Sequence, residues 1–256
     1  FFASLRRTIM NKIAIIIPSR LQAQRLPNKP LKLINNKEMI LHVHDQAIKS
    51  KAGEVFVATP DQRIIDTVKN AGGKAIKTSD DHQTGTDRIF EVFQKELNSK
   101  PDIVINLQGD MPNIQPQAIS DLVSYMQQKK CDIGTLASEF NSKTELDNPN
   151  VVKVAVKEKL LNNKFLNVFD FFRIDENSAY NLYHHIGIYA FTNKALIRYV
   201  SLKRSKFELE RKLEQLRALE NKMSIHVGYM KSSPLSIDTE EDLIKVKNLM
   251  EKNEKS

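Results

Sequence analysis

Residues 13–30 read IAIIIPSRLQAQRLPNKP, and this stretch decides the fold class. Residues 13–17 form a continuous apolar run rich in β-branched side chains, which is typical of a strand buried on both faces of a parallel sheet. The loop after this strand carries three cations, Arg20, Arg25 and Lys29, whose side chains are suited to phosphate oxygens. An ordinary basic surface loop is the alternative, but the position beyond the end of a buried strand favours a phosphate site. The glycine pattern of a P-loop is absent.

Downstream of this loop, strand-like and helix-like segments alternate along the chain. We expect strands near residues 55–59, 75–77, 103–107 and 132–137, and helices near 38–49, 61–72, 86–97 and 116–129. Such alternation predicts a parallel sheet with helices on both faces. In sheets of this kind, ligands bind at the carboxyl ends of the strands.

The second half of the sequence has a different pattern, with fewer helices between its strands. Strands are expected near 151–156, 165–169, 185–191 and 224–230, and helices near 193–202, 207–220 and 240–250. We interpret this half as a mixed extension that completes the sheet and adds a lobe for substrate recognition and dimer formation. No internal repeat and no linker rich in serine, glycine or proline separates the two halves.

Composition narrows the class of protein. The 256 residues carry a net charge of +8, and the basic side chains are spread along the chain among acidic ones. This distribution lacks the clustered lysines with interleaved aromatics that favour binding of single-stranded nucleic acid. No apolar run approaches the roughly 20 residues of a membrane helix, so membrane insertion is not expected. The single cysteine, Cys131, excludes an intrachain disulfide, fits a reducing cytoplasm, and is expected to be a buried bystander.

Two aspartates are candidate ligands of Mg2+. Asp110 closely follows the expected strand at 103–107, and Asp238 lies before the last expected helix. Mg2+ uses one or two protein carboxylates and completes its shell with phosphate and water oxygens. For Asp110, metal binding and an ordinary turn position are equally favoured. For Asp238, a cap on the last helix formed by either Thr239 or Asp238 is a sufficient explanation by itself.

Residues 81–88, which read DHQTGTDR, occupy another junction between a strand and a helix. Small and hydroxyl-bearing residues in this segment let a flat ring approach the backbone, whose N–H and C=O groups can recognise a base. Thr86 is the expected helix cap, and simple capping is the alternative explanation for the segment.

Together these segments resemble the 3-deoxy-manno-octulosonate cytidylyltransferase (CMP-Kdo synthetase) family over nearly the whole chain, from Ile13 to Met250. Each motif alone is weak, but seven of them occur in the family's order. They are IPSR at 17–20 with RLPNKPL at 25–31, HQTGTDR at 82–88, QGD at 108–110, NPNVVKV at 148–154, HIGIY at 185–189, LEQLR at 213–217, and IDT at 237–239 with EDL at 241–243.

The resemblance implies a Rossmann-like nucleotide-diphospho-sugar transferase fold, an α/β architecture with a mixed, mostly parallel sheet and a smaller substrate and dimerisation lobe. It also implies an enzyme that transfers CMP from CTP to Kdo or a similar acidic sugar, releases pyrophosphate and depends on Mg2+. Members of the family are typically cytoplasmic homodimers in lipopolysaccharide synthesis.

We expect an N-terminal extension at 1–11, one domain at 12–250 and a tail at 251–256. Within the domain we expect a CTP-binding half at 12–140, a sugar-binding and dimerisation half at 141–235, and a closing helix at 236–250.

The resemblance implies roles for particular residues as well. CTP would be held by Pro18, Ser19, Arg20, Arg25, Lys29, Thr84, Gly85, Arg88 and Gln108. The catalytic residues would be Arg20, Lys29, Asp110 and Asp238, with both aspartates as ligands of Mg2+. The sugar would be bound by Lys153, His185, Tyr189, Glu214 and Gln215.

Several positions depart from the family pattern. Met111 stands where the family has glutamate, and the family's Ser-Arg followed by Ile-Pro-Trp is replaced by FDFFR at 169–173. We hypothesise that Arg173 takes the place of the lost arginine. Lys206 and Arg211 stand where the family favours proline and a second glutamate.

Apart from Met111, these departures fall in the sugar-binding half. The nearest alternative is therefore a cytidylyltransferase for another acceptor, such as sialic acid or a polyol phosphate. A non-catalytic homologue and a basic nucleic-acid-binding protein are the remaining alternatives, and the second of these predicts salt-sensitive binding without pyrophosphate release.

Overall fold

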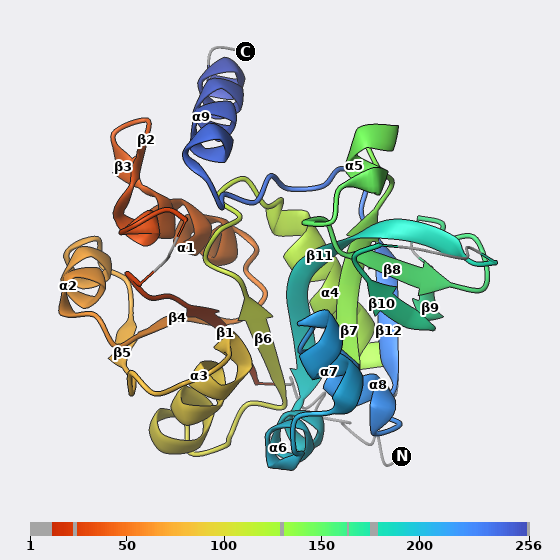
Figure 1. Cartoon of the computed structure of the whole chain (residues 1–256). Coiled ribbons are helices and arrows are strands. Elements are labelled where there is room, and N and C mark those ends of the chain that lie inside the picture. Colours follow the sequence, from red (N-terminus) through yellow and green to blue (C-terminus); the bar gives the residue numbers. More distant parts are fainter. Residues whose placement is uncertain (1–11, 23–24, 129–130, 163, 175–178, 255–256) are drawn as a thin grey trace, which may run out of the picture.

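The computed structural model describes residues 12–22, 25–128, 131–162, 164–174 and 179–254, and its main feature is one large sheet (Figure 1). The strand order is β5-β4-β1-β6-β11-β7-β12-β9. The first four of these are mutually parallel: β5 (Ala75–Lys77), β4 (Glu54–Thr59), β1 (Ile13–Pro18) and β6 (Ile103–Leu107). The parallel half of the sheet thus follows the alternation seen in the sequence.

The rest of the sheet is mixed. The long strand β11 (Asn181–Thr192) runs antiparallel to both β6 and β7 (Ile133–Ser138) and joins the two halves. β12 (Ile225–Tyr229) is parallel to β7, and β9 (Phe165–Asn167) closes this edge in the antiparallel direction. β8 (Lys153–Val156) pairs with β11 and with β10 (Asp170–Phe172). The predicted mixed, mostly parallel sheet is confirmed.

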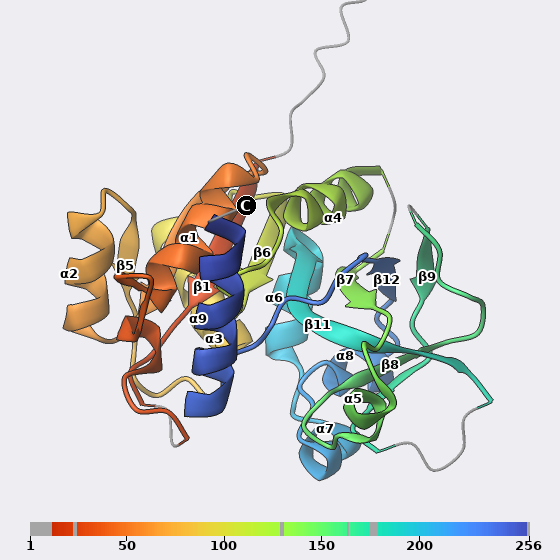
Figure 2. The same ribbon diagram turned by 90° about the horizontal axis from the view of Figure 1, so that it is seen from above.

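Alternate residues of β1 face two separate cores, which explains its continuous apolar sequence. Ile15 and Ile17 pack with α1 (Met39–Lys49), α2 (Gln62–Asn70) and α4 (Pro116–Gln128) on one face of the sheet. Ala14 and Ile16 pack on the other face, in a core that includes residues of α3 (Gly85–Glu91) and α6 (Asn193–Ser201). Figure 2 shows α1 and α4 on one side of the sheet, with α7 (Lys206–Arg211) and α8 (Leu216–Glu220) on the other.

A third, smaller core attaches the end of the chain to its beginning. The hairpin of β2 (Leu33–Ile34) and β3 (Lys37–Glu38) lies beside α9 (Glu240–Glu254) (Figure 1). The buried residues of this core are Leu26, Ile34, Met39, Ile237, Leu243 and Val246. Because Leu26 belongs to the basic loop after β1, α9 shares this core with that loop.

Several element boundaries differ from the sequence prediction. The helix expected at 207–220 is broken at Lys212, whose left-handed backbone (φ 55°) ends α7 before α8 begins. The strand expected at 165–169 is instead the two short strands β9 and β10. The predicted cap at Thr86 is also wrong: Thr84 caps α3, because its hydroxyl oxygen accepts the Asp87 N–H at 3.1 Å.

Three further elements were not anticipated: the β2–β3 hairpin, the short helix α5 (Lys143–Asp147) and the turn η1 (Lys29–Leu31). Among the described residues, no helix combines the length and the apolar composition needed to cross a membrane.

Candidate active site

A cleft of about 990 Å³ lies at the carboxyl ends of β1 and β6. Its walls come from the loop after β1, the segment before α3, the loop after β6 and the segment before α9. It is lined by all the residues that the family resemblance linked to CTP and Mg2+: Pro18, Ser19, Arg20, Arg25, Lys29, Thr84, Gly85, Arg88, Gln108, Asp110 and Asp238. It is also lined by Gln22, Leu26, Pro30, His82, Gln83 and Gly109, which sequence reasoning missed although all but Gln22 lie within the quoted motifs.

Lys29 forms ion pairs with both aspartates of this cleft. Its Nζ lies 3.2 Å from Asp110 Oδ2 and 3.2 Å from Asp238 Oδ1, and it donates to the Ile237 carbonyl at 2.8 Å. Burial disfavours the ammonium charge, but the two carboxylates outweigh that effect and raise the pKa of Lys29 above its usual value. Arg25 Nη2 pairs with the other Asp238 oxygen at 3.1 Å. The cleft therefore holds two carboxylates whose charges are balanced by Lys29 and Arg25.

Asp238 reaches the cleft through main-chain pairing with a distant segment. The Ile237 N–H donates to the Asp110 carbonyl at 3.0 Å, while the Ile237 side chain is buried in the third core. The capping alternative for Asp238 is not what the structure shows, since Thr239 fills that role: its hydroxyl oxygen accepts the Asp242 N–H at 3.2 Å. The Asp238 carboxylate is thus left for Lys29 and Arg25.

The two aspartates fit a site for Mg2+. Their carboxylates converge on a single cation, Lys29, although they are far apart in the sequence. In the described part of the chain, no group of three or more His, Cys, Asp or Glu side chains forms a metal site. A pair of carboxylates whose remaining ligands come from phosphate and water is the arrangement that Mg2+ favours at nucleotide sites.

Gly85 and Ser19 lie in the wall of the cleft. A Cβ atom at Gly85 would lie 3.2 Å from Pro18 Cγ, so glycine lets the start of α3 approach the end of β1. The Ser19 hydroxyl is buried and has no hydrogen-bond partner among the described residues. A buried polar atom without a partner at the wall of a cleft indicates a contact to a ligand.

Two charged side chains of α3, Arg88 and Glu91, form hydrogen bonds to the segment after β5. Arg88 is 3% exposed and donates to the Thr78 hydroxyl and, at 2.8 Å, to the Ser79 carbonyl. Burial, and then repulsion from Arg20, lower its pKa. His82 is paired with Glu91, which also accepts the Ser79 N–H at 2.9 Å. Burial disfavours the Glu91 charge, yet these hydrogen bonds lower its pKa to about 2.

The side chains predicted to bind the sugar lie deeper in the second half. Tyr189, Glu214 and Gln215 line a second, smaller cavity together with Thr86. Burial raises the pKa of Glu214, whose Oε1 accepts the Thr86 hydroxyl at 2.9 Å. His185 contacts the Tyr189 ring and bonds the Thr135 hydroxyl at 2.9 Å, but it lines neither cavity.

Lys153 and Arg173 are engaged with the backbone rather than with either cavity. Lys153 is 1% exposed, and its ammonium donates to the carbonyls of Asn148, Val151 and Arg173. The Arg173 guanidinium donates to the Asn150 carbonyl at 3.0 Å. Both side chains therefore fasten the loop before β8 to the end of β10.

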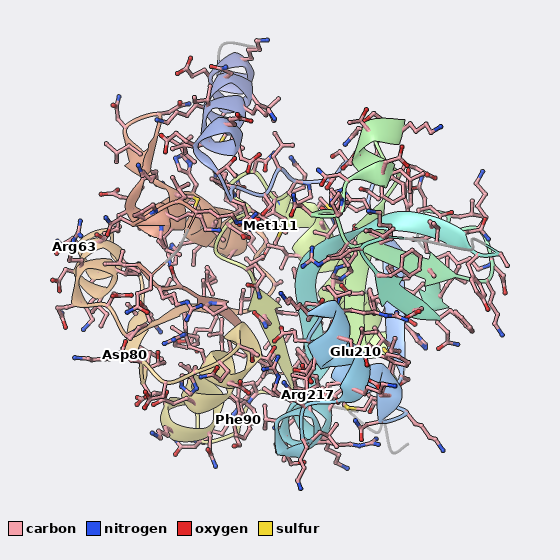
Figure 3. The ribbon with its side chains drawn as sticks, in the orientation of Figure 1. Arg63, Asp80, Phe90, Met111, Glu210 and Arg217 are labelled. Carbon is pink, nitrogen blue, oxygen red and sulfur yellow. The ribbon has the colours of Figure 1, made fainter. Side chains whose placement is uncertain are left out.

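Two residues singled out by their sequence positions belong to the core. Met111, which departs from the family pattern beside Asp110, is buried near the middle of the molecule (Figure 3). Cys131 is buried as predicted, and burial raises the pKa of its thiol to about 11. A thiol in that state is not an effective nucleophile at neutral pH.

Comparisons with known proteins agree with this geometry. A family model described as cytidylyltransferase matches residues 14–225. The 3-deoxy-manno-octulosonate cytidylyltransferase of Brucella ovis is 43% identical over 234 residues, which cover 91% of this chain and 93% of that protein. The relative of the same name from Brucella anthropi is 41% identical over 241 residues, covering 93% of this chain and 96% of the relative.

Solved structures extend the comparison. A CMP-2-keto-3-deoxy-manno-octonic acid synthetase in complex with CTP superimposes with a TM-score of 0.85 and 36% identity, covering 94% of this chain and 99% of that one. The 4-diphosphocytidyl-2C-methyl-D-erythritol synthase of Anaerococcus prevotii has a TM-score of 0.61 at 13% identity, with 94% and 99% of the two chains covered, and shows the fold alone.

Proposed function

The chain belongs to the cytidylyltransferase family and, within it, to the 3-deoxy-manno-octulosonate cytidylyltransferases, and on that premise we propose that it transfers CMP from CTP to the anomeric hydroxyl of Kdo. The observation that carries the proposal is the cleft in which the basic loop after β1 meets Asp110 and Asp238. The identity to relatives named for this reaction, and the likeness to a synthetase in complex with CTP, support both substrates.

The proposed reaction is an in-line displacement at the α-phosphorus of CTP. The anomeric oxygen of the sugar forms a bond to this phosphorus, the bond to the bridging oxygen of pyrophosphate breaks, and the hydroxyl proton is released. Negative charge develops on phosphoryl oxygens, so catalysis depends mainly on positioning and electrostatic stabilisation. Arg20, Arg25 and Lys29 would hold the triphosphate and stabilise the leaving pyrophosphate.

Asp110 and Asp238 are the residues that would hold Mg2+. When bound there, Mg2+ would supply charge neutralisation at the phosphate oxygens. Lys29 and Arg25 balance the charge of the same carboxylates.

We further propose that the enzyme is a cytoplasmic homodimer that supplies CMP-Kdo for lipopolysaccharide synthesis. Exposed apolar side chains around β9 and β10, namely Leu161, Phe169 and Ile174, support a contact between lobes of two copies. Light scattering should therefore give twice the 29.3 kDa mass of one chain, and a monomer at micromolar concentration would contradict the proposed assembly.

The reaction can be tested with the purified protein, CTP, Kdo and MgCl2, with pyrophosphate and CMP-Kdo as readouts. Replacing Kdo by sialic acid or a polyol phosphate tests the acceptor. Chelation by EDTA should abolish turnover, and added Mg2+ should restore it. If no acid sugar supports pyrophosphate release, the proposed function is wrong.

The metal ligands are tested by Asp110→Asn and Asp238→Asn. Each should lower kcat by about 10²-fold or more, since the developing charge loses its counter-ion. The matched control is Asp121→Asn on the exposed face of α4, where, within the part of the chain that the structure describes, the carboxylate bonds only Gln117. Undiminished turnover in Asp110→Asn would contradict the metal assignment.

A further inference from the structure

A directed chain of side-chain hydrogen bonds connects the buried Glu214 with the cleft. The Thr86 hydroxyl donates to Glu214 Oε1 at 2.9 Å and accepts from Asn106 Nδ2 at 3.2 Å. Asn106 Oδ1 then accepts from Gln108 Nε2 at 2.9 Å. Thr86 and Asn106 are 1% and 0% exposed, so water does not compete for these bonds, while Gln108 lines the cleft.

The order of donors along this chain follows from the hydrogen bond between Thr86 and Glu214. The Thr86 hydroxyl donates its only hydrogen to Glu214 Oε1, so it can offer Asn106 only lone pairs. Asn106 must then turn its NH2 group to Thr86 and its carbonyl to Gln108. Gln108 in turn must direct its own NH2 group at Asn106, which leaves its carbonyl oxygen Oε1 available.

Gln108 lies between two segments, the residues just before α3 and the part of β11 that carries His185 and Tyr189. A Cβ atom at Gly85, in the segment before α3, would be 3.4 Å from Gln108 Nε2. A Cβ atom at Gly187, on β11 between His185 and Tyr189, would be 3.4 Å from Gln108 Cγ. Among the described residues, none donates a hydrogen bond to Gln108 Oε1.

We propose that Glu214, Thr86 and Asn106 are positioning residues that fix Gln108 with its carbonyl oxygen ready to accept a hydrogen bond from the substrate. The proposal rests on the proposed cytidylyl transfer, which brings two donors to this cleft: the 4-amino group of cytosine and the hydroxyl groups of the sugar. A uracil base has a carbonyl where cytosine has its amino group, so two acceptors would face each other. Glu214 thereby acts on a substrate contact in the cleft although it lies in the second half of the chain.

The test compares Thr86→Val, which keeps the shape and removes the hydroxyl, with Thr86→Ser, which keeps the hydroxyl. If the donor is the cytosine amino group, the ratio of kcat/KM for CTP over UTP should fall about tenfold in Thr86→Val, the equivalent of one hydrogen bond. If the donor is a sugar hydroxyl, the KM for Kdo should instead rise about tenfold at an unchanged nucleotide ratio. In both cases Thr86→Ser should restore the wild-type value.

A matched control removes a hydroxyl from another helix N-terminus. Thr192 caps α6, where its hydroxyl oxygen accepts the Ala195 N–H at 3.2 Å. Thr192→Val should lower Tm without moving the CTP/UTP ratio or the KM for Kdo. The proposal is overturned if Thr86→Val changes neither quantity by more than twofold, or if Thr86→Ser is as impaired as Thr86→Val.

A second readout needs no turnover and separates this proposal from the proposed function. The side-chain NH2 protons of Gln108 should exchange slowly with solvent in the wild type and faster in Thr86→Val, as followed by NMR. Equal exchange in the two proteins would overturn the positioning chain even if the wild type is active. Absence of pyrophosphate release from wild type with any acid sugar would instead overturn the proposed reaction.

Discussion

His185 is a buried histidine whose pKa lies far below the usual value of about 6.5. It lies on β11 against Phe171 and Tyr189, and burial, with a smaller contribution from His184, lowers its pKa to about 3. Below pH 6.5 the unfolded chain therefore binds a proton that the folded protein does not. The stability that depends on a neutral His185 is complete above that pH and falls as the pH drops toward 3.

We predict that His185→Asn reduces the loss of stability between pH 7 and pH 5. The wild type should lose about 2 kcal/mol more of its unfolding free energy over this interval than the variant, because one fewer group takes up a proton on unfolding. Urea unfolding at both pH values measures this difference. His184 and His44, whose pKa values burial also lowers, are present in both proteins, so an identical pH dependence would contradict the assignment to His185.

At the scale of elements, two of the departures from the family pattern in the second half contact each other. Arg211 on α7 donates to Asp170 Oδ1 at 2.9 Å, to Asp170 Oδ2 at 2.8 Å and to the Phe171 carbonyl at 2.9 Å. This ion pair holds α7 against β10. Arg211 therefore binds the altered segment at 169–173 and holds it in place. Arg173 instead binds the loop before β8 through the Asn150 carbonyl.

A buried ion pair between Glu208 and Arg217 connects α7 to α8. Arg217 donates through Nε and Nη2 to the two Glu208 oxygens at 2.9 and 2.6 Å, and both side chains are almost fully buried. Glu208 also accepts the Ser205 N–H at 3.0 Å. The broken helix is thus tied across Lys212 by side chains rather than by continuous helical backbone.

Removal of one partner should be costly here. We expect Glu208→Gln to destabilise the protein by about 3–5 kcal/mol, because Arg217 would keep a buried charge without a counter-ion. Glu210→Gln is the matched control on the same helix: Glu210 is exposed and pairs with Lys206 at 3.8 Å, so its loss should cost no more than about 0.5 kcal/mol (Figure 3). Similar denaturation midpoints for the two variants would argue against this role for Glu208.

At the scale of the whole molecule, α9 connects the end of the chain to the nucleotide cleft. Leu243 is 1% exposed in the core shared with Leu26, whereas the neighbouring Ile244 is 53% exposed. Leu243→Ala should lower the unfolding free energy of the protein by about 2–5 kcal/mol. It should also raise the KM for CTP several-fold, because Leu26 in the same core is part of the basic loop and Asp238 directly precedes α9. Ile244→Ala should change stability by no more than about 0.5 kcal/mol and leave the KM unaltered. Calorimetric melting and steady-state kinetics of the pair provide the measurement, and an unaltered KM in Leu243→Ala would mean that α9 does not position the loop.

Much of the first half could be predicted because its signals are local. Continuous apolar runs mark strands buried on both faces, and the ends of parallel strands lie at one edge of the sheet, so the basic loop and Asp110 could be placed together. The break at Lys212 could not be predicted, since residues 207–220 carry a helical pattern and the left-handed turn at Lys212 is accompanied by pairing of Glu208 with Arg217.

By itself, the sequence determined the sheet class, the family and most of the residues that line the cleft, because periodicity and ordered motifs are local properties of the chain. Only the tertiary structure decided that Asp238 faces Lys29 rather than capping α9, that Lys153 binds backbone carbonyls, and that Glu214 is connected to Gln108. Each of these contacts depends on which hydrogen-bond donors and acceptors remain free once the neighbouring side chains have packed. Most of those neighbours are distant in sequence, so spacing along the chain does not encode the choice.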